Sequence, residues 1–97
     1  MGIFSNTNNN KPVIVTRKLT FKKSNYLGEI SDAVLYAAIM DACNKNNGVV
    51  ISTNFRSRWN DFPCNVKVLC TKEDWPAIVM SFLATVGKHV ENIKYRA

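Results

Sequence analysis

The sequence predicts an α+β fold, in which two helices cover one face of an antiparallel sheet and leave the other face open. Segments with the alternating apolar pattern of strands occur near the beginning, in the middle and near the end of the chain. Two segments between them repeat apolar residues with helical spacing. The two central strand segments are separated only by Asn60 and Asp61, which suits a two-residue hairpin turn. Together these patterns predict the order strand, helix, strand, strand, helix, short strand.

The chain divides into an arm and one domain. Residues 1–11, MGIFSNTNNNK, are rich in asparagine and have no apolar periodicity, so we expect a flexible arm there. Residues 12–97 contain no linker-like segment and are expected to form a single domain. Apolar residues make up 46% of the chain, which is typical of a globular protein and not of a disordered one.

The first strand is predicted within residues 12–23, PVIVTRKLTFKK. Lys18 and Lys22 are expected on its open side, since side chains alternate along a strand. Arg17 interrupts the apolar set on the opposite side, and a bulge near this residue or a strand end reaching solvent there would explain it. The apolar positions of that side are Val13, Val15, Leu19 and Phe21.

Both predicted helices carry residues that suit their ends. Ser31 can cap the first helix, and Gly48 can close it in the left-handed conformation. Asp74 can cap the second helix. The buried stripes expected from the spacing are Ile30, Val34, Leu35, Ala38, Ile39 and Ala42 in the first helix, and Trp75, Ile78, Val79, Phe82, Leu83, Val86 and Val90 in the second.

The register of the central hairpin follows from its short turn. Trp59 would lie opposite Phe62, and Thr53 opposite Val68. The core would then receive Val49, Ile51, Thr53, Phe55 and Trp59 from the second strand, and Cys64, Val66, Val68 and Cys70 from the third. The open face would receive Val50, Ser52, Asn54, Arg56, Arg58, Lys67 and Leu69.

The final segment, ENIKYRA, is the weakest strand prediction. Ile93 and Tyr95 are expected to face inward, and Lys94 and Arg96 outward. With this strand the order is that of the ferredoxin-like split βαβ fold, βαββα(β). This fold carries many unrelated functions, so function must be argued from the surface residues.

The charged residues are unevenly distributed over the predicted fold. The chain has 13 lysines and arginines against seven aspartates and glutamates, a net charge of +6. Such an excess favours polyanionic partners. The acidic residues are expected on helices and turns, whereas seven basic residues are expected on the open face: Lys18, Lys22, Arg56, Arg58, Lys67, Lys94 and Arg96.

These residues predict a small, non-enzymatic binding module that contacts nucleic acid. The basic face would bind phosphates, and Trp59 and Phe62 at the hairpin tip would stack on bases or wedge into a groove. The third strand, NVKVLCT, and the first, VIVTRKL, lack the outward aromatic residues of RNA-recognition motifs, so we expect weak sequence preference.

Three other interpretations remain open. Outward basic residues also solubilise a sheet and protect its edges, and Trp59 and Phe62 would then be a stabilising cross-strand pair. Alternatively, the same surface docks on an acidic partner protein, because Ile14, Val50 and Leu69 are expected beside the basic residues. A homodimer through the open face is the third arrangement. The short, Asn-rich chain also suits a viral or mobile-element accessory protein.

Several classes of function are not expected. The odd number of cysteines, Cys43, Cys64 and Cys70, predicts free thiols in a reducing, intracellular compartment, such as the cytoplasm of a cell or of a host. The first residues have no apolar segment of a signal peptide, and no segment is long enough to span a membrane. His89 is the only histidine and has no metal-ligand spacing, so we expect no metal, no cofactor and no catalytic residues.

Overall fold

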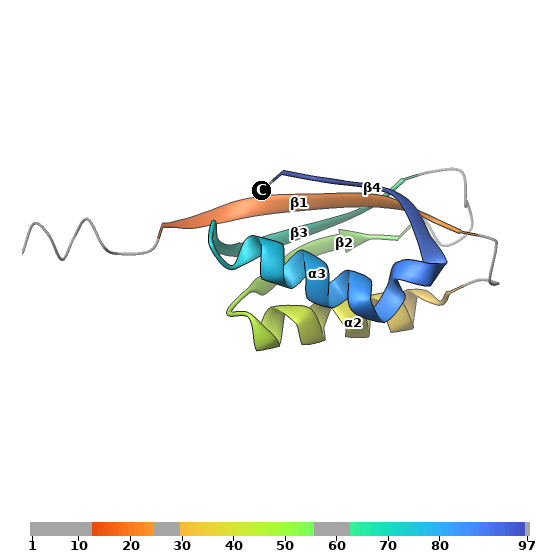
Figure 1. The fold of residues 1–97 in the computed structure, drawn as a ribbon, viewed down its shortest axis with the longest axis horizontal. Helices are drawn as coiled ribbons and strands as arrows, with labels where there is room; N and C mark the ends of the chain where they lie inside the picture. The colour runs from red at the N-terminus through yellow and green to blue at the C-terminus, as the bar shows by residue number, and fades with distance from the viewer. Residues whose placement is uncertain (1–12, 25–29, 56–62, 97) are drawn as a thin grey trace, which may run out of the picture.

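A computed structural model of the chain describes residues 13–24, 30–55 and 63–96. The elements in this part are β1 (Ile14–Lys23), α2 (Asp32–Lys45), β2 (Val49–Asn54), β3 (Cys64–Thr71), α3 (Trp75–Val86), the 3-10 turn η1 (Gly87–His89) and β4 (Val90–Tyr95). The strands lie in the order β2-β3-β1-β4, and each neighbouring pair is antiparallel. Both helices lie on the same side of the sheet (Figure 1), so the predicted α+β architecture with one covered and one open face is confirmed. The arm predicted over residues 1–11 lies outside the described residues.

The core lies between the sheet and the two helices. Strand β3 is central and alternates strictly between its two faces, which buries Cys64, Val66, Val68 and Cys70. Helix α3 buries Trp75, Ile78, Val79, Phe82 and Val86 of the predicted stripe, whereas Leu83 is only partly buried and Val90 belongs to β4. Each large side chain removed from water in this way contributes about 1.5–3 kcal/mol of transfer free energy. The pattern therefore fixes which face of the sheet meets the helices.

Strand β1 runs without interruption beside β3. Its register extends from Ile14 opposite Thr71 to Phe21 opposite Cys64, with no bulge at Arg17. Arg17 stays on the helix side of the sheet, opposite Val68, and its side chain is half-buried. A bulge is therefore not the reason why a charged residue interrupts the apolar set.

The helix caps agree with the prediction at one end and differ at another. Ser31 accepts a hydrogen bond from the Val34 amide at 3.2 Å, as predicted. Asp74 precedes α3 but makes no side-chain cap, because its carboxylate accepts the Thr71 hydroxyl at 2.9 Å instead. Val34 was expected in the core, but this prediction is wrong, because its side chain is 49% exposed. The buried stripe of α2 consists of Leu35, Ala38, Ile39, Ala42 and Cys43.

Gly48 has a different role from the one predicted. The left-handed residue after α2 is Asn47, with φ 59°. At Gly48 a Cβ atom would lie 2.6 Å from Cδ1 of Ile78, closer than real Cβ contacts allow. Glycine is required here because β2 begins where α3 packs closely, and not because of a positive φ.

The β2–β3 register differs from the prediction by two residues. Thr53 lies opposite Val66 and not opposite Val68, although it stays on the predicted side of the sheet. A bulge between Val50 and Ser52 then reverses the sides of the first residues of β2. Val50 consequently packs against the core, whereas Val49 and Ile51 are exposed. The predictions for these three residues are wrong, because the sequence pattern assumed an unbroken alternation. The predicted turn lies outside the described residues.

Strand β4 pairs with β1 and completes the sheet. Its register places Tyr95 opposite Leu19 and Lys94 opposite Thr20, with an irregularity between Glu91 and Lys94. Asn92, with φ 53°, occupies this irregular position. Tyr95 faces the helices, as predicted, and its ring meets that of Trp75 edge-on, with the ring centroids 6.4 Å apart.

Candidate functional site

The open face carries three basic residues in one row, which we call the basic row. Lys67 of β3 and Lys18 of β1 are direct cross-strand partners. Continuing the β1–β4 register one residue beyond the pair of Leu19 and Tyr95 brings Arg96 beside Lys18. The basic row is therefore Lys67, Lys18 and Arg96, and all three side chains are exposed. Three cations thus lie side by side across three neighbouring chain segments.

Polar groups lie next to the basic row on the same face. One residue pair further along the sheet, Asn65 lies opposite both Thr20 of β1 and Asn54 of β2. Lys94 lies opposite Thr20 in β4 and adds a fourth cation. Amide, hydroxyl and ammonium donors of this kind are the groups that bind phosphate oxygens in nucleic-acid complexes.

Acidic residues are nearly absent from this face in the described part of the chain. On the helix side, the carboxylate of Asp32 forms an ion pair with the buried Lys23, with Oδ1 2.6 Å from Nζ. Asp41 pairs with Lys45 at 3.0 Å on the outer surface of α2. The exception is Glu91, which was expected outside the sheet but lies in β4 opposite Lys22. Among the described residues the basic row therefore has no carboxylate partner.

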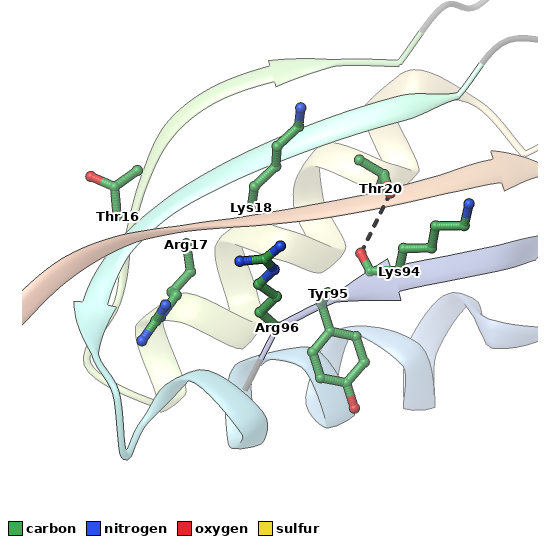
Figure 2. Close-up of a pocket in the computed structure, with 7 residues that line it drawn as sticks. All are labelled: Thr16, Arg17, Lys18, Thr20, Lys94, Tyr95 and Arg96. Carbon is green, nitrogen blue, oxygen red and sulfur yellow. Dashed lines mark hydrogen bonds between the residues drawn. The ribbon is translucent and has the colours of Figure 1, made fainter.

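A cavity of about 530 Å³ opens at the edge of β1, where β4 ends. Figure 2 shows Lys18 and Thr16 on one side of β1, Arg17 on the other, and Arg96 reaching toward β1 from the end of β4. Next to Lys18 and Arg96 in this lining, the Thr20 hydroxyl donates a hydrogen bond of 3.5 Å to the carbonyl oxygen of Lys94, its partner in the β1–β4 register. The lining residues are Thr16, Arg17, Lys18, Thr20, Lys94, Tyr95 and Arg96.

Arg17 is an unusual member of this lining. Its Nε atom is buried and has no hydrogen-bond partner, and among the described residues its guanidinium forms no ion pair. A buried donor without an acceptor costs about 1–3 kcal/mol. Arg17 is therefore a cation held at the cavity with part of its hydrogen-bonding capacity unused.

The three thiols are poorly suited to chemistry. Burial, with a smaller contribution from the nearby Cys70, raises the pKa of the Cys43 thiol to about 11. Burial also raises the pKa of the Cys70 thiol, as does Asp74, while Arg17 acts in the opposite direction. The Cys64 thiol donates a hydrogen bond to the Phe55 carbonyl at 3.1 Å. All three cysteines are buried, so they behave as small core residues.

The structure brings together five of the nine residues predicted for the site. Lys18, Lys22, Lys67 and Lys94 are on the open face, and Arg96 follows at the end of β4. The other four, Arg56, Arg58, Trp59 and Phe62, lie outside the described residues. Sequence reasoning did not assign the cavity residues Thr16, Arg17, Thr20 and Tyr95 to the site. The interruption of the apolar set by Arg17 was the one signal that pointed to them.

An exposed apolar patch occupies one end of the open face. Val49 and Leu69 are cross-strand partners there, and both are exposed. Ile14 and Ile51 are 55% and 50% exposed, and they complete the patch, defined as Ile14, Val49, Ile51 and Leu69. Val50, which was expected in this patch, is turned inward by the bulge. The face is thus basic in its centre and apolar at one end.

Metal-binding groups, membrane-spanning helices and similarity to known proteins all bear on the function of this face. Over the described ranges, no group of three or more His, Cys, Asp or Glu residues could hold a metal ion. No helix in these ranges has the length and hydropathy to cross a membrane. Comparison of the chain with protein-family models, curated proteins and solved structures finds no match. Function must therefore be inferred from the side chains themselves.

Proposed function

We propose that this chain is a non-enzymatic binding module that contacts nucleic acid through the open face of its sheet. The observation that carries the proposal is the direct cross-strand pairing of Lys18 with Lys67, with Arg96 as the next cation in the row. Like charges directly opposite one another destabilise a sheet. A polyanion laid across the row would remove that repulsion and gain a phosphate contact from each cation.

Solubility alone accounts less well for the basic row. A soluble surface is served by lysines interspersed with acidic residues, which avoids a field of a single sign. Elsewhere in the described chain this mixture is present, since Lys45 pairs with Asp41 and Lys23 with Asp32. On the open face, by contrast, Lys18 lies directly opposite another cation, Lys67. This contrast supports a role in binding an anionic partner.

The proposed contacts are with the backbone of the nucleic acid. The described open face carries no aromatic side chain, because Phe21, Phe55 and Tyr95 belong to the helix side of the sheet. Base stacking would depend on Trp59 and Phe62, which lie outside the described residues. Binding should accordingly be salt-dependent and weakly sequence-selective.

The strand order and the buried thiols support proposals for the fold and for the cellular compartment. We infer a ferredoxin-like split βαβ arrangement, supported by β4 beside β1, by β2 at the opposite edge and by a helix in each of the two βαβ units. An intracellular setting is supported by the buried thiols of Cys43 and Cys70, since free thiols persist in reducing compartments.

The test is oligonucleotide binding measured by fluorescence anisotropy over a series of salt concentrations. Neutralising three to five phosphates on a single strand gives a slope of log affinity against log salt of about −2 to −3.5. The double variant K18E/K67E should abolish most of this binding. K72E/K88E, which reverses two exposed lysines outside the strands, makes the same change in net charge and is the control. Equal losses in the two variants, or no binding by the folded protein at low salt, would exclude the proposal.

The apolar patch supports a second candidate function, docking on an acidic partner protein. Ile14, Val49, Ile51 and Leu69 form an exposed apolar patch next to basic residues, and protein interfaces use apolar contacts of this kind. Under this alternative L69D should abolish partner binding, whereas K67E should mainly slow association. Under the nucleic-acid proposal the charge variant has the larger effect on oligonucleotide affinity. The two functions are therefore distinguished by which variant dominates.

A further inference from the structure

We propose that the cavity at the end of β4 binds the terminal phosphate of a nucleic-acid strand lying along the basic row. This inference rests on the proposed function and names the part of the ligand that the cavity takes. The cavity adjoins the row, because Lys18 and Arg96 belong to both. A strand crossing from Lys67 toward β4 therefore reaches the cavity at the edge of the sheet.

The cavity collects cations from both sides of β1. Lys18 reaches it from the open face and Arg17 from the helix side, while Lys94 and Arg96 reach it from β4 and the residue after it (Figure 2). The cavity opens here because β4 pairs with β1 only as far as Leu19 and, with Arg96 following beside Lys18, leaves residues 14–17 of β1 without a described neighbour on that edge. An edge of this kind also presents backbone amides that can donate to an anion.

Arg17 indicates that the anion is more than a passing backbone phosphate. Its buried Nε has no acceptor, although it lies at the wall of a cavity large enough for a phosphate group. Arginine binds phosphate oxygens through a planar fork of donors, and an oxygen placed in the cavity would accept from the guanidinium of Arg17, whose Nε stays buried. On the open face alone, Lys18 and Lys67 would serve an internal phosphate without the help of Arg17.

The charge of the cavity suits a monoester better than a diester. A terminal phosphate carries a charge of about −1.5 to −2 at neutral pH and presents three acceptor oxygens. An internal phosphodiester carries a single negative charge and must continue in both directions along the strand. Four cationic side chains around one cavity match the larger charge. The basic row would then hold the body of the strand, and the cavity its end.

The test compares three oligonucleotides of one sequence, bearing a 5′-phosphate, a 3′-phosphate or no terminal phosphate. We expect one phosphorylated end to bind about 3–10-fold more tightly than the unphosphorylated strand, equivalent to one additional charge-assisted contact. The preference should fall when the pH is lowered below about 6, where the second phosphate proton is taken up. Equal affinity for all three strands would overturn the inference and leave the proposed function standing.

Two cavity variants, one control variant and one spectroscopic measurement complete the test. R96Q should remove the preference without threatening the fold, since its side chain is exposed, and R17Q should do the same. K22Q, on the same face but outside this cavity, should weaken all three strands equally. If no oligonucleotide binds, the proposed function fails. Amide NMR shifts on addition of inorganic phosphate then decide the cavity alone: shifts at residues 16–20 and 94–96 support it, and their absence overturns it.

Discussion

Reversing the charge of Lys67 should make the protein more stable and bind nucleic acid less tightly. Lys67 is exposed and lies directly opposite Lys18, so K67E replaces a repulsion by an attraction without disturbing the core. K67Q removes the repulsion alone and should give about half of the stabilisation. Because the two effects have opposite signs, a general loss of folding could not imitate them.

The size of the effect follows from Coulomb's law. Two unit charges roughly 7 Å apart in water interact with about 0.6 kcal/mol, and physiological salt, with a Debye length of about 8 Å, reduces this to about 0.25 kcal/mol. Reversing one charge changes the sign of the interaction, so the gain in unfolding free energy is about 0.5 kcal/mol. For a domain of this size that corresponds to a rise in melting temperature of about 2–4 °C.

The assay is thermal unfolding followed by circular dichroism, repeated at low and high salt, together with oligonucleotide anisotropy. The gain in melting temperature should shrink as salt rises, because both charges are exposed to solvent. K88E serves here as the control, since it has the same change in net charge away from the sheet. A melting temperature for K67E at or below that of the unchanged protein would refute the repulsion argument. Binding that K67E leaves unaltered would refute the assignment of the face.

Three further predictions concern the fold. G48A should lower the unfolding free energy by about 1–3 kcal/mol in a denaturant titration, because its Cβ would lie 2.6 Å from a buried isoleucine, whereas G87A, with open space around it, should not. D32N should cost about 1–3 kcal/mol in the same titration, since it leaves the ammonium of Lys23, only 4% exposed, without its counter-charge, and a cost near zero would contradict this. Thiol titration with a disulfide reagent should show at least 100-fold slower reaction of Cys43 in the native than in the unfolded protein, since its pKa of about 11, against 9.0, lowers the thiolate fraction by about 100-fold before burial is counted.

The sequence was sufficient where the apolar pattern admits one solution. β3 alternates strictly, and α3 keeps one apolar stripe over its length, so both buried faces were predicted correctly. The inward side of Tyr95 and the outward side of Lys94 followed from the same alternation. In these segments a slip of one residue would expose several apolar side chains, and that cost fixes the faces.

The sequence was insufficient where neighbouring residues are equally apolar. Val49, Val50 and Ile51 fit either face, so nothing in their pattern indicates the bulge that turns Val50 inward. The requirement for Gly48 depends on the approach of Ile78, which lies thirty residues away in the chain. The cavity depends in turn on where β4 stops pairing with β1, at Tyr95 and Leu19. Each of these features is set by tertiary contacts and not by local pattern.

The arrangement of the open face bears on the kind of partner. A two-fold dimer through this face would bring the basic row of one copy toward that of the other, adding repulsion between copies to the repulsion already present between Lys18 and Lys67. A nucleic-acid duplex would satisfy the cations but offer little to the apolar patch of Ile14, Val49, Ile51 and Leu69, since its bases are stacked inside. A single strand offers phosphates and unstacked bases together, and so matches both halves of the face. The composition of the face therefore favours single-stranded nucleic acid over a second copy of the chain and over a duplex.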